Sequence, residues 1–244
     1  MKSEKSKWIK MAQEYLFPNR CPVCFDIVVP RGNYICDVCR DKFPIITGAV
    51  CKKCGKPLDE EEKEFCRDCI CHRRSFVQGI AMMPYQDAVV HRMMLRVKYQ
   101  NARQLLDYPC QLMGIRYKNM VKNWNIEALI PVPIHESRRR MRGFNQAEEI
   151  ALRLGNFWEI PVDTSLLYRK KKTVPQKDLT SEQRFRNLKD AFAIEEKAEH
   201  KYRCVMLVDD IYTTGSTLEC CSRTLLEGGM ERVYMAVLAS GYDQ

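Results

Sequence analysis

From residue 76 onward, short apolar runs alternate with longer segments in which apolar residues recur at helical spacing. The apolar runs have the length of strands, and we expect strands at 76–85, 128–133, 165–168, 203–208 and 232–239. Helical spacing of apolar residues predicts helices at 87–99, 101–120, 145–157 and 217–227. Strands that alternate with helices predict an α/β fold, a parallel sheet with helices on both faces.

Three segments depart from this alternation. Residues 135–142 are basic, and we expect a loop there. Residues 170–186 are polar, charged and without a period, so they predict a long mobile loop. Near the start, apolar residues recur at helical spacing and predict a short amphipathic helix within residues 1–20, packed on a neighbouring domain.

Residues 21–74 follow a different pattern, in which cysteines replace the apolar runs. Four CxxC pairs start at a fifteen-residue period, namely Cys21/Cys24, Cys36/Cys39, Cys51/Cys54 and Cys66/Cys69. Two such pairs supply four thiolates that can surround one zinc ion as a tetrahedron. A segment of only about 50 residues buries too little apolar surface to fold on its core alone, so it needs a metal or disulfides.

Zinc fits this array better than disulfides do. Each disulfide contributes about 2–4 kcal/mol and needs an oxidising compartment, whereas structural zinc contributes about 10–16 kcal/mol in small peptides. We therefore expect two structural zinc ions, each closed by four thiolates. Sequence spacing leaves adjacent and interleaved grouping of the pairs open, and Cys71 and His72 are alternative ligands. The predicted organisation is a helix at 1–20, a double zinc ribbon at 21–74 and an α/β domain at 75–244.

Composition adds a preference for phosphate-bearing partners. The chain has 244 residues, 45% of them hydrophobic, and its 40 Lys and Arg exceed its 31 Asp and Glu, which gives a formal charge of +9. A basic surplus suits phosphorylated ligands or nucleic acid. The apolar runs are too short to cross a bilayer, and the first residues lack the apolar segment of a secretory signal. We expect a cytoplasmic protein without membrane insertion.

The segment from Val205 to Thr217 carries the clearest candidate chemistry. A buried strand ends in Asp209 and Asp210, and a turn of small and hydroxyl residues leads into a helix. Ligands of open α/β sheets bind at the carboxyl ends of strands, and a helix N-terminus attracts phosphate. Gly215 lets the backbone approach that phosphate closely. The two acids suit sugar hydroxyls or a ligand-bound Mg²⁺. The segment predicts a site for a phosphorylated ribose, foremost phosphoribosyl pyrophosphate (PRPP).

Two other interpretations explain less of this segment. Helix capping accounts for one or two of the polar residues, but not for two acids and four hydroxyls around one glycine. An apolar strand that ends in Asp-Asp is also typical of the Walker B motif. That motif works with a GxxxxGK[ST] loop, which this sequence lacks.

The segment resembles the PRPP signature of type I phosphoribosyltransferases. Together with the CxxC array, Pro131-Val132-Pro133 and the RGFNQ sequence at 142–146, it resembles the ComF family more narrowly. That family joins an N-terminal zinc domain to a phosphoribosyltransferase domain. The resemblance implies a Rossmann-like core with a mobile hood loop and PRPP with Mg²⁺ as ligand. It also implies a role in natural competence, where incoming single-stranded DNA is handled.

The resemblance also assigns residues to the parts of the ligand. It places Asp209 and Asp210 at the ribose hydroxyls and at Mg²⁺. It places the 5′-phosphate among Thr213, Thr214, Gly215, Ser216 and Thr217. On the pyrophosphate side the candidates are Arg138, Arg139, Arg140, Arg142, Gly143, Asn145 and Gln146. In the flexible loop they are Gln176, Leu179, Arg184 and Asn187. Lys98, at the end of an amphipathic helix, is a further candidate.

Three functions follow from these features. The first is a PRPP-binding protein of DNA uptake, with single-stranded DNA and proteins of the competence machinery as partners. The second is a salvage phosphoribosyltransferase that joins a nucleobase or an amine to PRPP. The third is a non-catalytic nucleic-acid adaptor, whose zinc ribbons and basic runs at 138–140 and 169–172 contact phosphates. No residue stands out as a general base, so the sequence leaves the acceptor and catalysis itself open.

Overall fold

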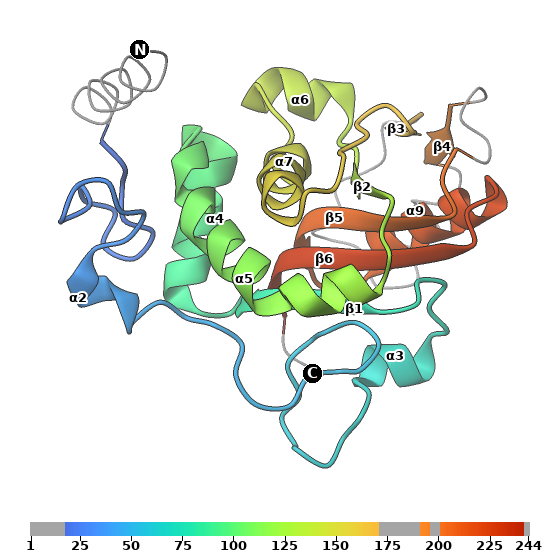
Figure 1. The fold of residues 1–244 in the computed structure, drawn as a ribbon, viewed down its shortest axis with the longest axis horizontal. Helices are drawn as coiled ribbons and strands as arrows, with labels where there is room; N and C mark the ends of the chain where they lie inside the picture. Colours follow the sequence, from blue (N-terminus) through green and yellow to red (C-terminus); the bar gives the residue numbers. More distant parts are fainter. Residues whose placement is uncertain (1–17, 171–190, 196–200, 242–244) are drawn as a thin grey trace.

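Within residues 18–170, 191–195 and 201–241, which the computed structural model describes, a four-stranded parallel sheet occupies the centre (Figure 1). The strand order is β1 (Gly79–Pro84), β6 (Arg232–Ser240), β5 (Cys204–Tyr212) and β2 (Ala128–Pro131). All three neighbouring pairs run parallel. The α/β fold with a parallel sheet, which the alternating pattern predicts, is confirmed.

Helices cover both faces of this sheet. One face carries α4 (Ala88–Gln100), α5 (Asp107–Asn123) and α7 (Gln146–Trp158), and the other carries α9 (Ser216–Glu227). Side chains alternate between the faces along each strand. In β5, Met206 and Val208 therefore belong to the core under α4, α5 and α7, whereas Val205 and Leu207 belong to the core under α9.

The predicted loop at 135–142 is wrong, because Glu136–Arg142 form a helix, α6. The His135 side chain accepts a hydrogen bond from the Ser137 amide and caps the start of α6. Gly143, with φ of +79°, ends the helix in the left-handed conformation. The basic run is therefore the exposed surface of a short, capped helix.

Other elements differ from the expectation in extent or in pairing. The strand predicted at 165–168 is β3 (Leu167–Arg169), which lies outside the parallel sheet and pairs antiparallel with β4 (Phe192–Ile194). A 3₁₀ turn, η1 (Arg103–Leu106), precedes α5. The strand predicted at 203–208 continues to Tyr212, so both acids lie within β5 rather than after it.

Some predictions fall outside the described residues. They include most of the helix expected at 1–20 and nearly all of the loop expected at 170–186. The four loop candidates Gln176, Leu179, Arg184 and Asn187 are among them. None of the described helices combines the length and the apolar character that crossing a membrane requires.

The cysteine-rich segment forms two small units on opposite faces of the sheet. We call residues 18–43 the first ribbon and residues 49–71 the second ribbon. The first contains α2 (Asp37–Arg40) and packs with α4 and α5, and the second contains α3 (Arg67–Cys71) and shares the core under α9 (Figure 1). Each ribbon shares one of the two hydrophobic cores of the sheet. The domain border expected between residues 74 and 75 stays a prediction.

Candidate functional site

Each ribbon gathers four cysteines into one site. One group is Cys21, Cys24, Cys36 and Cys39, and the other is Cys51, Cys54, Cys66 and Cys69. Within each group the sulfur atoms all lie within 4.8 Å of one another. Adjacent CxxC pairs therefore share a site, which settles the grouping that the spacing left open.

The sulfur geometry fits tetrahedral zinc. Zinc–sulfur bonds of about 2.3 Å place the four sulfurs of a tetrahedron about 3.8 Å apart. The Sγ atoms of Cys24 and Cys36 are 4.0 Å apart, and those of Cys54 and Cys66 are 3.6 Å apart. Cys71 and His72 are exposed and belong to neither group. Two four-thiolate sites of this kind support structural zinc, since neither leaves a position for substrate.

Residues 213–217, which we call the 213–217 loop, follow the carboxyl end of β5 and include the first two residues of α9. Gly215 occupies the N-cap position with φ of +75°, and a Cβ atom there would lie 2.4 Å from the Tyr212 hydroxyl. Only glycine fits such a position. The Oγ1 atom of Thr214 and the Oγ atom of Ser216 are 3.1 Å apart. The first amides of a helix have no intrahelical acceptor and carry the positive end of its dipole, so the loop can receive an anion.

The two acids of β5 differ in their partners. The Asp210 carboxylate forms an ion pair of 2.7 Å with the Lys98 ammonium, which comes from the last turn of α4. Burial lowers the pKa of Lys98, but Asp210 outweighs it and the net shift is upward. The pKa of Asp209 is raised to about 8, first by burial and then by the neighbouring Asp210 charge. Burial and the neighbouring charge thus both disfavour the ionised form of Asp209.

Charges of two arginines from further elements act in this region, that of Arg169 on Asp209 and that of Arg138 on Arg169. The pKa of Arg169, in β3, is lowered first by burial and then by the charge of Arg138 in α6. The charge of Arg169 also acts on Asp209. Of the predicted pyrophosphate candidates, Arg138 is thus grouped with the acids through Arg169. Sequence reasoning placed Arg169 only in a basic run, since a three-residue strand gives no signal of where its side chains lie.

The other pyrophosphate candidates are engaged within the α6–α7 corner. Arg139 pairs with Glu148 at 3.1 Å and Arg140 pairs with Glu136. Arg142 donates to the Gln146 Oε1 atom at 2.9 Å. These contacts stabilise the corner between the two helices.

Asn145 also has a local role. Its side-chain oxygen accepts from the Ala147 amide and caps α7, and its side-chain nitrogen donates to the Val132 carbonyl at 3.0 Å. Both groups of the amide are thus used to fix β2 against α7. The adjacent Gly143 supplies the left-handed turn that separates α6 from this cap.

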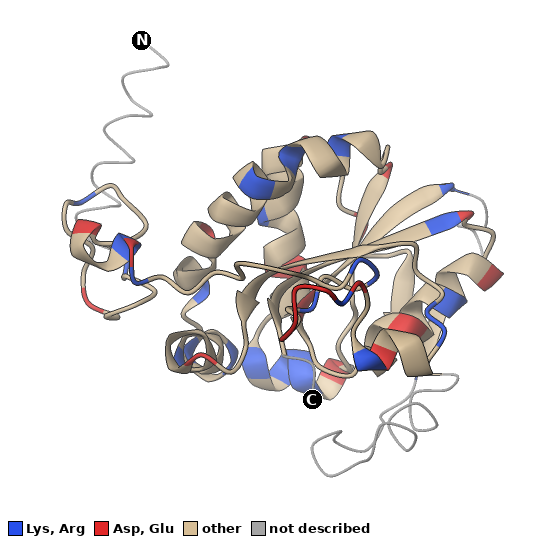
Figure 2. Cartoon of the chain, turned by 90° about the horizontal axis from the view of Figure 1, so that it is seen from below, with Lys and Arg blue, Asp and Glu red and all other residues tan. Residues whose placement is uncertain are grey.

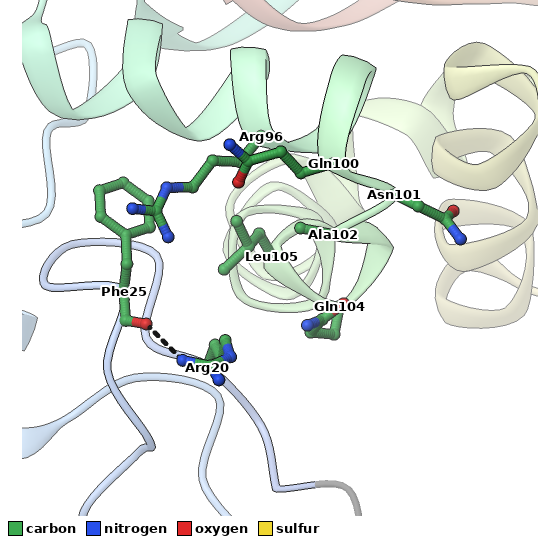
Figure 3. Close-up of a pocket in the computed structure, with 8 residues that line it drawn as sticks. All are labelled: Arg20, Phe25, Arg96, Gln100, Asn101, Ala102, Gln104 and Leu105. Atoms are coloured by element: carbon green, nitrogen blue, oxygen red, sulfur yellow. Dashed lines mark hydrogen bonds between the residues drawn. The ribbon is translucent and has the colours of Figure 1, made fainter. Parts of the chain in front are cut away.

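A separate cavity of about 280 Å³ lies between the first ribbon and the end of α4 (Figure 3). The Arg96 guanidinium lies over the Phe25 ring, 4.1 Å from its centroid, and Arg20 donates to the Phe25 carbonyl at 3.2 Å. The remaining lining residues are Gln100, Asn101, Ala102, Gln104 and Leu105. Within the described ranges, no ion pair with a carboxylate is found for Arg20, Arg92 or Arg96.

Sequence reasoning missed this cavity because Arg20 and Arg96 are far apart along the chain and meet only through the fold. Net charge does not mark it either. Lys and Arg positions are spread over many elements and are interspersed with Asp and Glu (Figure 2). What distinguishes the cavity is the combination of arginines and an aromatic ring around a hollow.

Comparisons with known proteins cover both parts of the chain. A family model described as "Double zinc ribbon domain" matches residues 12–70. Competence protein F of Haemophilus influenzae is 30% identical over 227 residues, which are 91% of this chain and 97% of that protein. Competence protein ComFC of Bacillus subtilis is 26% identical over 80% of this chain and 79% of that protein.

Two further matches complete this picture. The DNA utilization protein YhgH of Escherichia coli (strain K12) is 23% identical over 88% of this chain and 94% of that protein. Among solved structures, a purine phosphoribosyltransferase from Pyrococcus horikoshii is 12% identical, with a TM-score of 0.34 over 55% of this chain and 83% of that chain.

Proposed function

Because the chain belongs to the family of competence protein F and ComFC, we propose that it binds PRPP with Mg²⁺ and acts in the cytoplasm on incoming single-stranded DNA. The relatives are named for competence and for DNA utilization, which supports the second part of this proposal. The first part rests on the end of β5. There, Asp209 and Asp210 lie shortly before the glycine-containing 213–217 loop at the N-terminus of α9.

The loop at 213–217 suits the 5′-phosphate of the ligand. It offers the hydroxyls of Thr213, Thr214, Ser216 and Thr217 together with the first amides of α9. Gly215 leaves the approach to these amides free of a side chain. A phosphate held in this way is stabilised by several N–H donors and by the helix dipole.

The acids suit the ribose. A sugar diol can donate hydrogen bonds to Asp209 and Asp210, and carboxylate oxygens are the ligands that Mg²⁺ prefers. In the absence of ligand, the Lys98 ammonium supplies the positive charge beside Asp210. On ligand binding, Mg²⁺ and the ribose hydroxyls would share or replace that role.

The pyrophosphate group would lie toward the basic side chains near Asp209. The charge of Arg169 acts on this acid, and the charge of Arg138 acts on Arg169. Guanidinium groups bind phosphate oxygens through two parallel hydrogen bonds. Arg139 and Arg140 stay candidates, because ion pairs at an exposed helix surface contribute little and exchange readily for a phosphate. Arg142, whose recorded partner is the neutral Gln146, stays a candidate too.

The cavity beside Phe25 favours nucleic acid as the second ligand. A guanidinium that lies on an aromatic ring can present its other face to a base, and arginines without a carboxylate partner suit phosphates. The volume of about 280 Å³ is near the lower end of small-molecule sites, about 300 Å³. We propose that one nucleotide of a single strand enters it.

The PRPP site is tested by Asp210→Asn. Hydrogen bonds to a charged group contribute about 1.5–3 kcal/mol, so the loss of this charge should weaken PRPP binding about ten- to hundredfold. Equilibrium dialysis with Mg²⁺ and labelled PRPP measures the change. Asp107→Asn is the matched control. Asp107, at the start of α5, also pairs with a basic residue, Arg153 of α7, but lies outside the proposed site.

We expect the control to bind PRPP like the wild type. Equal affinity of the Asp210→Asn variant and the wild type would contradict the assignment of the acids. Pyrophosphate release from bound PRPP, measured with nucleobases, amines and DNA oligomers, then decides between a salvage transferase and a binding protein.

A further inference from the structure

We propose that the second ribbon holds the 213–217 loop in its anion-binding conformation and that Arg74 is the positioning residue between them. The inference rests on the proposed function of that loop. It assigns to one of the two ribbons a direct role in ligand affinity, in addition to its own folding.

Arg74 connects the ribbon to the loop directly. It follows the second ribbon in the sequence and donates from a terminal guanidinium nitrogen to the Thr214 carbonyl at 2.8 Å. The side chain is half-buried, so its bond to Thr214 competes little with water. One arginine thus joins the segment that follows the second ribbon to the backbone of the loop.

The next residue fixes the start of α9. The Ser75 amide and hydroxyl donate to the two carboxylate oxygens of Glu219, at 2.8 and 2.7 Å. Glu219 lies in the first turn of α9 and is 2% exposed. A buried carboxylate with these bonds ties the helix N-terminus, which supplies the loop amides, to the segment after the ribbon.

The buried residues of the second ribbon also pack against Tyr212, the residue just before the loop. Tyr212, the last residue of β5, is buried in the same cluster as Cys51, Cys54 and Cys66. The Lys56 ammonium lies 5.8 Å from the centre of its ring. The ring also meets Gly215, where no Cβ atom would fit. A shift of the ribbon would therefore move Tyr212 and the glycine together.

Lys56 itself belongs to the ribbon and is held there. It is 3% exposed and pairs with Asp68 at 2.5 Å. Such a buried pair is costly to break by the loss of one partner. The position of Lys56 under Tyr212 thus depends on the ribbon being folded.

The first ribbon has no comparable relation to the loop. It lies on the opposite face of the sheet, where Phe43 packs against Tyr108 with ring centroids 4.9 Å apart. Its other contact of note is that of Phe25 with Arg96. The two ribbons should therefore differ: loss of the second site should weaken anion binding, and loss of the first should not.

The test uses Arg74→Met and Arg74→Lys in the full chain. Arg116→Met is the matched control, because Arg116 also donates to a backbone carbonyl near the ribbons, that of Ile46 at 2.7 Å, but not to the loop. Calorimetry measures PRPP binding with Mg²⁺. Hydrogen exchange of the amides at 213–217, without ligand, reports the loop itself. Zinc content and thermal melting show whether each variant is folded.

We expect Arg74→Met to bind PRPP at least tenfold more weakly and to exchange the loop amides faster, with zinc content as in the wild type. Arg74→Lys should recover part of both, and Arg116→Met should match the wild type. Cys54→Ser should reproduce the effect of Arg74→Met, whereas Cys24→Ser should leave the loop amides unchanged. Wild-type affinity and wild-type loop exchange in a folded Arg74→Met variant would overturn the proposal.

The two proposals fail in different ways. If the wild type does not bind PRPP, the proposed function is wrong. Faster exchange of the loop amides in Arg74→Met and Cys54→Ser, but not in Arg116→Met and Cys24→Ser, would still support the coupling between the second ribbon and the loop. Wild-type loop exchange in both Arg74→Met and Cys54→Ser would overturn that coupling, whether or not the protein binds PRPP.

Discussion

Asp209 and Asp210 are neighbours in the sequence, but the fold gives their carboxyl groups different surroundings. Asp210 meets Lys98 at 2.7 Å, whereas the pKa of Asp209 is raised to about 8 by burial and by Asp210. Two adjacent acids in a partly buried site do not both ionise easily. Burial and the neighbouring carboxylate therefore both disfavour the ionised form of Asp209 in the free protein.

This difference predicts that PRPP binding is pH-dependent. Ribose hydroxyls and Mg²⁺ favour the ionised form of Asp209, so the ligand should lower its pKa from about 8 and release a proton on binding. Affinity should rise from pH 7 to pH 8 and level off above that, by at most about tenfold per pH unit. Calorimetry in two buffers of different ionisation enthalpy measures the released proton.

Asp209→Asn is the control for this effect, because an amide does not titrate. Its affinity should be lower than that of the wild type and nearly constant between pH 7 and pH 8. A wild-type affinity that rises on acidification, or uptake of a proton on binding, would contradict the assignment of the raised pKa to the ligand site.

At the scale of elements, the sequence predicted the parallel sheet and most helices, because apolar periodicity follows burial directly. It did not predict α6, since the only apolar residue of that basic run, Met141, is exposed and gives no burial signal. The capping groups of His135 and Gly143 determine that helix instead. The cysteine spacing predicted two metal sites. It left open which pairs join and whether Cys71 or His72 substitutes as a ligand.

Contacts between distant segments were beyond this reasoning. Arg74 and Thr214 are joined by a hydrogen bond, as are Ser75 and Glu219, although each pair is far apart in the sequence. Neither residue 74 nor 75 lies in a pattern that marks a partner. The acid pair and the glycine of the site could be predicted because their chemistry is local to one strand–loop–helix segment.

Two glycines at the ends of helices provide a matched test of the loop. Gly143 and Gly215 both have positive φ, +79° and +75°, but a Cβ atom is free of contacts at Gly143 and lies 2.4 Å from the Tyr212 hydroxyl at Gly215. Gly143→Ala should cost about 1–2 kcal/mol of stability from backbone strain alone. Gly215→Ala should cost more, because Tyr212 must also move.

Chemical denaturation measures the stability of the two variants, and dialysis measures PRPP binding. We expect PRPP affinity to fall much more in Gly215→Ala than in Gly143→Ala. Equal loss of stability and of affinity in both variants would mean that the contact between Gly215 and Tyr212 does not shape the loop.

At the scale of the whole molecule, each ribbon lies at one of the two proposed ligand sites. The first ribbon forms the cavity beside Phe25 together with α4, and the second lies under the 213–217 loop. Helix α4 connects the regions, because Arg96 lines the cavity and Lys98 pairs with Asp210. Helix α4 thus contributes one residue to each of the two proposed sites.

Single-stranded DNA binding should be mainly electrostatic. Each phosphate neutralised on a single strand contributes about −0.7 to the slope of log affinity against log salt. If Arg20 and Arg96 each contact a phosphate, the double variant Arg20→Ala, Arg96→Ala should reduce the slope by about 1.4. Fluorescence anisotropy with a labelled oligonucleotide at several salt concentrations measures it.

Arg203→Ala is the control for surface charge, since Arg203 is exposed and lies at the amino end of β5, away from the cavity. It should leave the slope unchanged. An affinity that does not depend on salt, or an equal change of slope in the control, would contradict a DNA site at Phe25.

The most direct test of the central claim is a calorimetric titration of the wild-type protein with PRPP in the presence and absence of Mg²⁺. Inorganic phosphate and ATP serve as comparison ligands. We expect PRPP to bind at one site per chain, more tightly with Mg²⁺ than without it, and far more tightly than either comparison ligand. No binding of PRPP with Mg²⁺, or equal binding of ATP, would contradict the assignment of the β5 acids and the 213–217 loop to a phosphorylated ribose.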